Sequence, residues 1–198
     1  MDLICTPMSQ INLMVVMWFI MYGIGGILTF PIMDKIGRRK TSIIFNTGHI
    51  FAHTLIIFSS DFITRTIGFT LLGFFSATKN SVCYAWLFEL VNQKDKSFAN
   101  TCLNMGDYLV LLLAGLYFIF VSQDWAPLIM SIYFIDVAAS LVILFLCSES
   151  PRWLLMQGRR QEAIQSLNFI AKVNGSTKKI APETEFLESK SSKVTTDH

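Results

Sequence analysis

Charged residues are scarce in this sequence: Asp, Glu, Lys and Arg make up 15% of its 198 residues. Soluble globular domains average about 25% charged residues. Hydrophobic residues supply 53% of the chain, and its mean hydropathy is +0.50. This composition excludes an ordinary soluble domain and indicates helices that face lipid and one another.

Two sequence patterns are also lacking: paired cysteines and, in the first residues, the features of a secretory signal. The four cysteines form no CxxC pair and show no metal-ligand spacing, so they are interpreted as small apolar residues. The first residues, Met-Asp-Leu, lack the basic region and the cleavage site of a secretory signal. The sequence shows no nucleophile–base pairing, no phosphate-binding loop and no convincing metal site. We therefore expect no enzyme activity, no cofactor, no metal and no nucleic-acid partner.

Long hydrophobic stretches follow one another along the chain, at about 11–33, 41–60, 66–91, 98–122 and 126–147. An α-helix needs about 20 apolar residues to cross a hydrocarbon core ~30 Å thick. The short connections between the stretches are typical of antiparallel neighbours in a bundle. We therefore predict an all-α membrane protein with five transmembrane helices within residues 1–148. A cytoplasmic amphipathic helical segment, 149–175, and a disordered tail, 176–198, are expected to follow.

Lys and Arg are distributed unevenly among the loops. Fourteen of the 16 lie after the first, third or fifth stretch, whereas Arg65 lies after the second and Lys79 lies within the third. Cytoplasmic loops of membrane proteins carry the excess of Lys and Arg. We therefore expect a multi-pass protein whose N-terminus is outside and whose C-terminal tail is cytoplasmic, in either the plasma membrane or an internal membrane.

Three charged motifs lie at the predicted cytoplasmic ends of the helices. The first, DKIGRR at 34–39, closes a hairpin in which glycine permits a turn that a bulkier residue would strain. The second joins the third and fourth stretches, and the third, SESPRWLL at 148–155, follows the fifth. By themselves such loops are equally typical of any membrane protein with a basic inner face. The key residues of the motifs are Asp34, Gly37, Arg38, Arg39, Glu89, Lys96, Glu149 and Arg152.

Together the three motifs resemble the major facilitator superfamily. The first is similar to its loop between the second and third helices, and the second to its signature between the fourth and fifth. The third is similar to the segment that ends the sixth helix of sugar porters and organic ion transporters. Residues 2–5, DLIC, resemble the end of the outer loop in the organic cation/anion branch. The resemblance covers roughly residues 2–175 and implies helices two to six of a twelve-helix carrier.

This resemblance implies transport of small organic solutes, organic ions or sugars, across a lipid bilayer by alternating access. The motif residues would pair while the carrier faces outward and separate when it opens inward; the alternative is that they anchor the helices at the lipid headgroups. Transport would also require the missing half of the carrier as a partner. The alternative function is a truncated, non-transporting membrane protein that binds or regulates a full-length carrier.

Three charged residues, Lys79, Asp107 and Asp136, lie roughly 15–18 Å from the predicted inner ends, at ~1.5 Å per helical residue. An ionised side chain at this depth costs at least about 2.5–3.5 kcal/mol, so each needs a partner, a proton or a watery cavity. We predict that Lys79 and Asp107 line the translocation path. Asp107 would attract a cation or carry a coupling proton, and Lys79 would balance its charge. The alternative is a buried ion pair that fixes helix register.

Other polar residues of the spans allow further predictions. By resemblance to organic cation carriers, Tyr84 is expected to face the substrate, and Asp136 is a further candidate for this role. His49 and His53 lie one helical turn apart, but the sequence shows no third metal ligand beside them. We therefore expect them to form interhelical hydrogen bonds. Close packing between helices is expected at Gly23, Gly26, Gly68 and Gly73.

Overall fold

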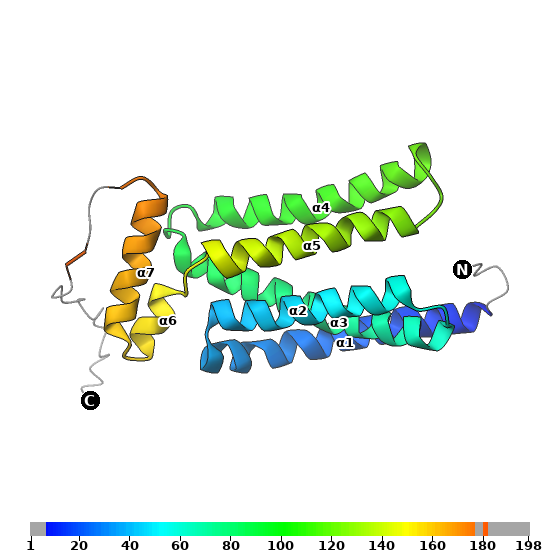
Figure 1. Cartoon of the computed structure of the whole chain (residues 1–198), viewed down its shortest axis with the longest axis horizontal. Helices are drawn as coiled ribbons and strands as arrows, with labels where there is room; N and C mark the ends of the chain where they lie inside the picture. The colour runs from blue at the N-terminus through cyan, green and yellow to red at the C-terminus, as the bar shows by residue number, and fades with distance from the viewer. Residues whose placement is uncertain (1–6, 177–179, 182–198) are drawn as a thin grey trace, which may run out of the picture.

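The computed structural model describes residues 7–176 and 180–181, which fold into helices joined by short loops (Figure 1). Each predicted hydrophobic stretch falls on one long helix. Within the described residues, α1, α2, α4 and α5 are long and apolar enough to cross a membrane. The long helices are α1 (Met8–Ile36), α2 (Arg38–Phe58), α3 (Phe62–Leu90), α4 (Lys96–Phe120) and α5 (Ala126–Leu146).

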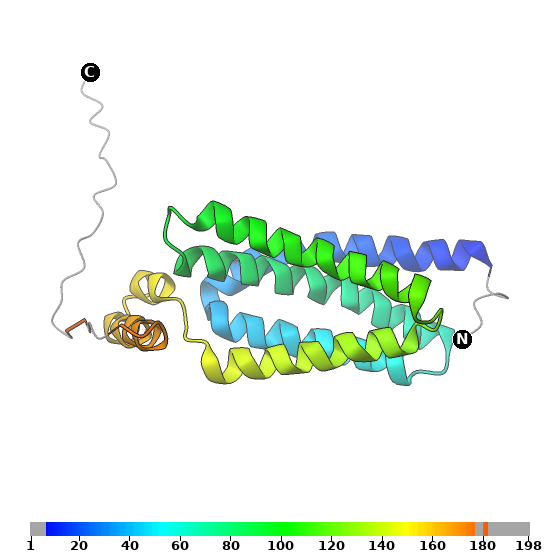
Figure 2. The same cartoon turned by 90° about the horizontal axis from the view of Figure 1, so that it is seen from above.

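Helix α3 is the centre of the bundle. Both α1 and α2 pack along it, α5 packs against α2, and α4 makes a lighter contact with α3 (Figures 1 and 2). The buried residues of α3 include Ala77, Thr78 and Val82, which are almost completely enclosed. In contrast, no residue of α4 is buried by the part of the chain that the structure describes. The buried interior of the bundle is therefore built by α1, α2, α3 and α5.

Two glycines let α1 and α3 approach closely. A Cβ atom at Gly25 would lie 2.5 Å from the carbonyl oxygen of Phe74, and one at Gly73 would collide with that of Trp18. The prediction of close packing is thus confirmed at Gly73, and also at Gly68, where an added Cβ would lie 3.0 Å from Ile56 and 3.1 Å from Leu55 on α2. It is wrong at Gly23 and Gly26, where an added Cβ would meet no described atom within 4 Å.

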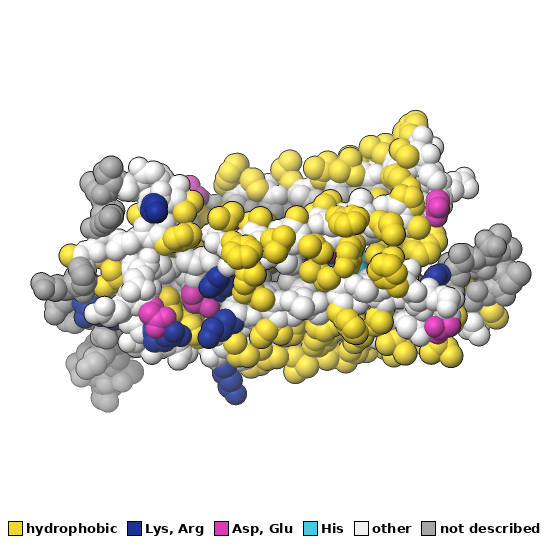
Figure 3. All heavy atoms as spheres, in the orientation of Figure 1, with side chains coloured by type: hydrophobic (Ala, Val, Ile, Leu, Met, Phe, Trp, Pro, Cys, Tyr) yellow, Lys and Arg dark blue, Asp and Glu magenta, His cyan; other side chains and the backbone are white. Residues whose placement is uncertain are grey.

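The outer surface of the long helices is apolar. Figure 3 shows hydrophobic side chains across the middle of the bundle and charged side chains gathered toward its ends. Ile27 and Phe120 are both 76% exposed. Soluble monomers rarely expose so continuous an apolar surface, which is instead typical of contact with lipid. The structure therefore agrees with a multi-pass membrane protein.

Two short helices, α6 (Pro151–Met156) and α7 (Arg160–Val173), follow α5. They are separated at Gly158, whose φ of +73° is favourable for glycine. Trp153 and Leu154 pack against Ala163 to form a small core between the two helices. Helix α7 runs across one end of the bundle, opposite the end at which α1 begins (Figure 1). The predicted disordered tail, 176–198, lies outside the described residues except at positions 176, 180 and 181.

Candidate functional site

The first charged cluster surrounds Arg38 at the α6–α7 end of the bundle. Gly37, with φ +103°, is the single residue between α1 and α2 and places Arg38 at the first position of α2. The Arg38 side chain is only 5% exposed. Its Nε and Nη2 atoms donate to the carboxylate of Glu89 on α3 at 2.8–3.1 Å, and Nη2 also lies 2.9 Å from Asp34 Oδ1. One guanidinium thus links three helices.

Glu149 binds the N-terminus of α2. Its Oε1 atom accepts hydrogen bonds from the backbone N–H groups of Arg38, Arg39 and Ser150, at 2.8, 2.9 and 3.0 Å. The N–H groups of a first helical turn have no partners within the helix, and the helix dipole favours a negative charge there. The carboxylate between α5 and α6 therefore holds the α1–α2 hairpin by its backbone.

The remaining motif residues fall into two groups. The indole Nε1 of Trp153 donates to the Asp34 carbonyl at 2.8 Å, and Arg39 Nη2 donates to the Leu144 carbonyl, so α6 and α5 are fastened to the same turn. Among the described residues, Lys96 and Arg152 form no ion pair. Arg38 contacts both oxygen atoms of the Glu89 carboxylate, and the pairing of Lys96 within the gate remains a prediction.

The second charged cluster lies inside the bundle, and it corrects the predicted partner of Lys79. Lys79 Nζ lies 2.7 Å from Asp136 Oδ1 on α5, not beside Asp107. The reason is the packing order: α5 lies against α2 on the side that Lys79 faces, whereas Asp107 lies on α4. Asp136 is the one residue of α5 that the described chain buries. An otherwise lipid-facing helix is thus attached through a carboxylate.

His49 and His53 complete this intramembrane cluster, which we define as His49, His53, Lys79 and Asp136. His49 Nε2 lies 3.2 Å from Ser76 Oγ on α3, so the expected interhelical hydrogen bond is present. Asp136 Oδ2 lies 3.0 Å from His49 Nδ1 and 3.6 Å from His53 Nδ1. The expectation that no third possible metal ligand accompanies the histidines is therefore wrong.

Tyr84 and Asp107 form a separate pair between α3 and α4. The Tyr84 hydroxyl donates to Asp107 Oδ2 at 3.4 Å. Both groups lie on the side of the bundle that α3 and α4 leave uncovered, which we call the open face. Asp107 is exposed there, and the neighbouring Tyr108 is 69% exposed. A carboxylate in the middle of so apolar a helix is costly against lipid. This face is therefore suited to a watery cavity or to further protein.

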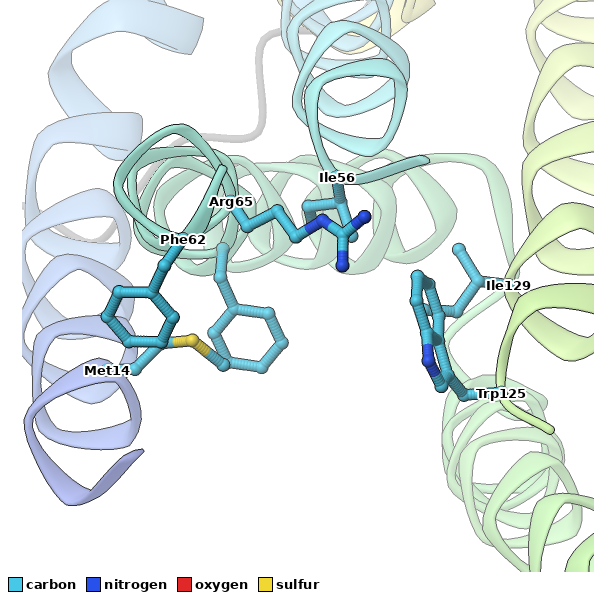
Figure 4. Close-up of a pocket in the computed structure, with 7 residues that line it drawn as sticks. Met14, Ile56, Phe62, Arg65, Trp125 and Ile129 are labelled. Atoms are coloured by element: carbon cyan, nitrogen blue, oxygen red, sulfur yellow. The ribbon is translucent and has the colours of Figure 1, made fainter. Parts of the chain in front are cut away.

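At the opposite end of the bundle, a cavity of about 160 Å³ lies between α1, α2, α3 and α5 (Figure 4). Its lining is apolar apart from Arg65, whose guanidinium lies 5.5 Å from the ring centre of Trp125. Arg65 also donates twice to the Ser59 carbonyl, at 2.9 and 2.6 Å. A cation beside the last carbonyl groups of α2 is favourable to the helix dipole. Arg65 therefore connects the end of α2 to the start of α5.

Sequence reasoning missed the polar face of α2. Ser42, Asn46, His49 and His53 recur every three or four residues and are all buried. Asn46 Nδ2 donates to Ser140 Oγ on α5, and Ser140 donates to the Asp136 carbonyl at 2.8 Å. The helical spacing of these polar residues could have indicated that α2 faces another polar helix.

The chain was compared with known proteins. The profile of the family described as sugar (and other) transporter matches residues 5–197. A carcinine transporter of Drosophila melanogaster is 31% identical over 153 residues, which are 76% of this chain and 22% of that protein. Solute carrier family 22 member 21 of Mus musculus is 25% identical over 199 residues, covering 99% of this chain and 34% of the relative. Organic cation/carnitine transporter 2 of Homo sapiens is 27% identical over 192 residues, covering 93% and 32%.

The chain thus spans between about a fifth and a third of the length of these relatives. The family match nevertheless extends over nearly all of its residues, and the family is one of transporters, not of enzymes. The helical fold and the apolar surface agree with this assignment. The chain therefore belongs to the sugar (and other) transporter family of the major facilitator superfamily.

Proposed function

We propose that this chain supplies the second to sixth helices of a carrier that moves small organic solutes by alternating access. In this proposal α3 is a fifth transmembrane helix, because it is as long as α1 and lies among the apolar helices. The α6–α7 end, with its basic loops, is cytoplasmic, and the N-terminus is outside. The observation that carries the proposal is the Arg38 cluster, which joins α1, α2 and α3 at that end.

The Arg38 cluster is proposed to be the cytoplasmic gate. Its Arg38–Glu89 pair crosses between helices, and Glu149 holds the α2 N-terminus from the α5–α6 connection. These contacts lie within one half of the proposed carrier, where they hold the inner helix ends in the positions at which the other half would close against them. A conformational equilibrium of a few kcal/mol can be shifted by such a set of contacts. Lys96 and Arg152 would find partners in the other conformation or in the rest of the carrier.

The solute is proposed to be a small organic cation or zwitterion. Two relatives are named for carcinine and for organic cations and carnitine. Asp107 supplies a carboxylate on the open face, and Tyr84 supplies an aromatic ring and a hydroxyl beside it. A carboxylate attracts an ammonium group, and an aromatic face adds a cation–π contact. Lys79 and Asp136, which neutralise one another, would support this face from inside the bundle.

Uptake of a labelled quaternary ammonium probe, tetraethylammonium, tests this assignment in a carrier that contains this chain with the remaining helices. Asp107→Asn should raise KM about 10-fold or more, since a hydrogen bond to a charged group contributes about 1.5–3 kcal/mol. The matched control is Asp124→Asn, which changes an exposed carboxylate in the α4–α5 loop and should leave uptake unchanged. Equal uptake by both variants and the parent would refute the proposed role of Asp107.

A second candidate function is regulation of a full-length carrier by this shorter chain. It requires a translated product that consists of this chain alone, which covers about a third or less of the length of its relatives. Sequencing the transcript on both sides of the reading frame separates the two functions. A frame that continues into a preceding helix and a second half supports the carrier. A message that ends at His198 supports the regulator, which should then alter solute uptake when expressed with a full-length relative.

A further inference from the structure

The intramembrane cluster contains three buried groups with the chemistry of metal ligands. His49, His53 and Asp136 are 6%, 5% and 6% exposed. One ligand atom from each residue lies within 4.8 Å of the other two. Two imidazoles and a carboxylate form a donor set that suits Zn²⁺ and similar divalent transition metals. Helix α2 provides both imidazoles from adjacent turns, and α5 provides the carboxylate.

Two ligand atoms lie close together in the interior of the bundle. His49 Nδ1 and Asp136 Oδ2 are buried 3.0 Å apart, where a protonated imidazole would form an ion pair, and neither has any other hydrogen-bond partner among the residues that the structure describes. A buried polar atom without a partner carries a desolvation cost of about 1–3 kcal/mol. Ligand atoms of a tetrahedral Zn²⁺ site lie roughly 3.3 Å apart, given metal–ligand bonds of about 2.0–2.1 Å. The spacing of these two atoms is close to that of atoms that share a metal ion.

The outer hydrogen bonds can leave one ring nitrogen of each imidazole free to bind a metal ion. His53 Nδ1 lies 3.2 Å from the His49 carbonyl, which can only accept, so Nδ1 carries the proton and Nε2 carries the lone pair. His49 Nε2 lies 3.2 Å from Ser76 Oγ; a proton on Nε2 donates to this hydroxyl and leaves the lone pair on Nδ1. Metal-bound histidines characteristically donate their other N–H group to such oxygen atoms.

From these observations we propose that His49, His53 and Asp136 bind a divalent transition metal ion, of the Zn²⁺ class, between α2 and α5. Lys79 does not bind the ion itself: its ammonium group holds Asp136 Oδ1 at 2.7 Å and leaves Oδ2 for the metal. The bound ion would fasten α5 to α2. Apart from Asp136, no side chain of α5 is buried by the described chain. The site is separate from the Tyr84–Asp107 pair and does not depend on the identity of the transported solute.

Cobalt binding to the purified full chain in detergent tests the proposal, after metal has been removed with a chelator. Titration with Co²⁺ should produce visible absorption bands of a nitrogen- and oxygen-ligated ion, saturating at one equivalent and reversed by Zn²⁺. His49→Gln or Asp136→Asn should weaken binding by more than about 10-fold, because even loss of an outer hydrogen bond to a ligand costs about 10–100-fold. The matched control is His198→Gln, which removes the third histidine of the chain and should not change the affinity.

Two further variants keep all three ligands and change only their surroundings. Ser76→Ala should weaken Co²⁺ binding about 10-fold through loss of the outer hydrogen bond. Lys79→Met should also weaken it about 10-fold, because it removes the outer hydrogen bond that holds Asp136 Oδ1. Helix content and elution volume are measured for each variant, and if His49→Gln does not fold, these two variants decide the test.

The proposal would be overturned by either of two results. One is the absence of saturable Co²⁺ or Zn²⁺ binding to the folded chain. The other is binding that is unchanged in His49→Gln, or that shows the charge-transfer band of thiolate ligation, which would assign the ion to cysteines such as the exposed Cys102. An increase in the thermal unfolding temperature on Zn²⁺ addition, lost in His49→Gln, would further support the proposal.

Discussion

Removal of the Glu89 carboxylate should destabilise the chain more than removal of any exposed acidic partner. Glu89→Gln keeps the size of the side chain but leaves the Arg38 guanidinium, which is 5% exposed, without its main countercharge. Asp34 remains 2.9 Å away, yet its side chain is 62% exposed and therefore compensates poorly. Loss of one partner of a buried ion pair costs about 3–5 kcal/mol. We expect about 3 kcal/mol, at the lower end of this range, because Glu89 is 12% exposed and Asp34 stays in place.

The chain contains a matched control for this substitution. Arg159 and Glu162 form an equally short ion pair on α7, but their side chains are 43% and 49% exposed. Glu162→Gln should therefore cost less than about 1 kcal/mol. Its effect should also vanish in high salt, whereas the effect of Glu89→Gln should persist, because buried charges are screened much less than exposed ones.

Denaturant unfolding of the purified chain in detergent micelles, followed by circular dichroism, measures both free-energy changes. The double variant Arg38→Met, Glu89→Leu should recover part of the stability, since an apolar pair of similar volume often replaces a buried ion pair without loss. If Glu89→Gln is no more destabilising than Glu162→Gln, the Arg38 cluster is not a buried electrostatic lock, and the proposed gate loses its physical basis.

Three further predictions concern the helix ends. Gly37→Ala should cost about 1–3 kcal/mol in unfolding titrations, because φ is +103° and the new Cβ would lie 2.6 Å from Glu149 Oε2; no loss would show that the turn relaxes freely. Glu149→Gln should cost about 0.3–2 kcal/mol by the same assay, because a charge leaves the α2 N-terminus, and an unchanged value would contradict the capping role. The Thr64 N–H group donates to Asp61 and holds the pKa of that carboxyl below 3.8. Its stabilisation is complete above pH 3.8 and is lost as the pH falls through the lowered pKa, so Asp61→Asn should flatten the acid branch of the stability curve.

The long helices could be predicted from the sequence because a single physical constraint dominates them. A bilayer requires about 20 apolar residues per span, and charge cannot be buried there without a partner. The helices extend beyond the predicted stretches at several ends, for example from 11–33 to Met8–Ile36, since charged residues such as Lys35 still form helix at the membrane surface. The amphipathic segment predicted at 149–175 contains two helices, α6 and α7, which the positive φ of Gly158 separates.

The sequence predicts how deep the charged residues lie in the membrane but not which of them form pairs. Spacing along the chain gives the depth of a residue, whereas pairing also depends on the direction in which its side chain leaves the helix. Lys79, Asp107 and Asp136 have similar depths, so depth alone permits Lys79 to pair with either carboxylate. Direction separates them: Lys79 and Tyr84 are five residues apart on α3 and therefore point about 140° apart, at 3.6 residues per turn. Tyr84 faces Asp107 on α4, so Lys79 faces the opposite side of α3, where α5 approaches α2. The sequence contains both clues, the polar residues along one side of α2 and the angle between Lys79 and Tyr84. Used together, they would have favoured the Lys79–Asp136 pair and would have placed Asp136 beside His49 and His53.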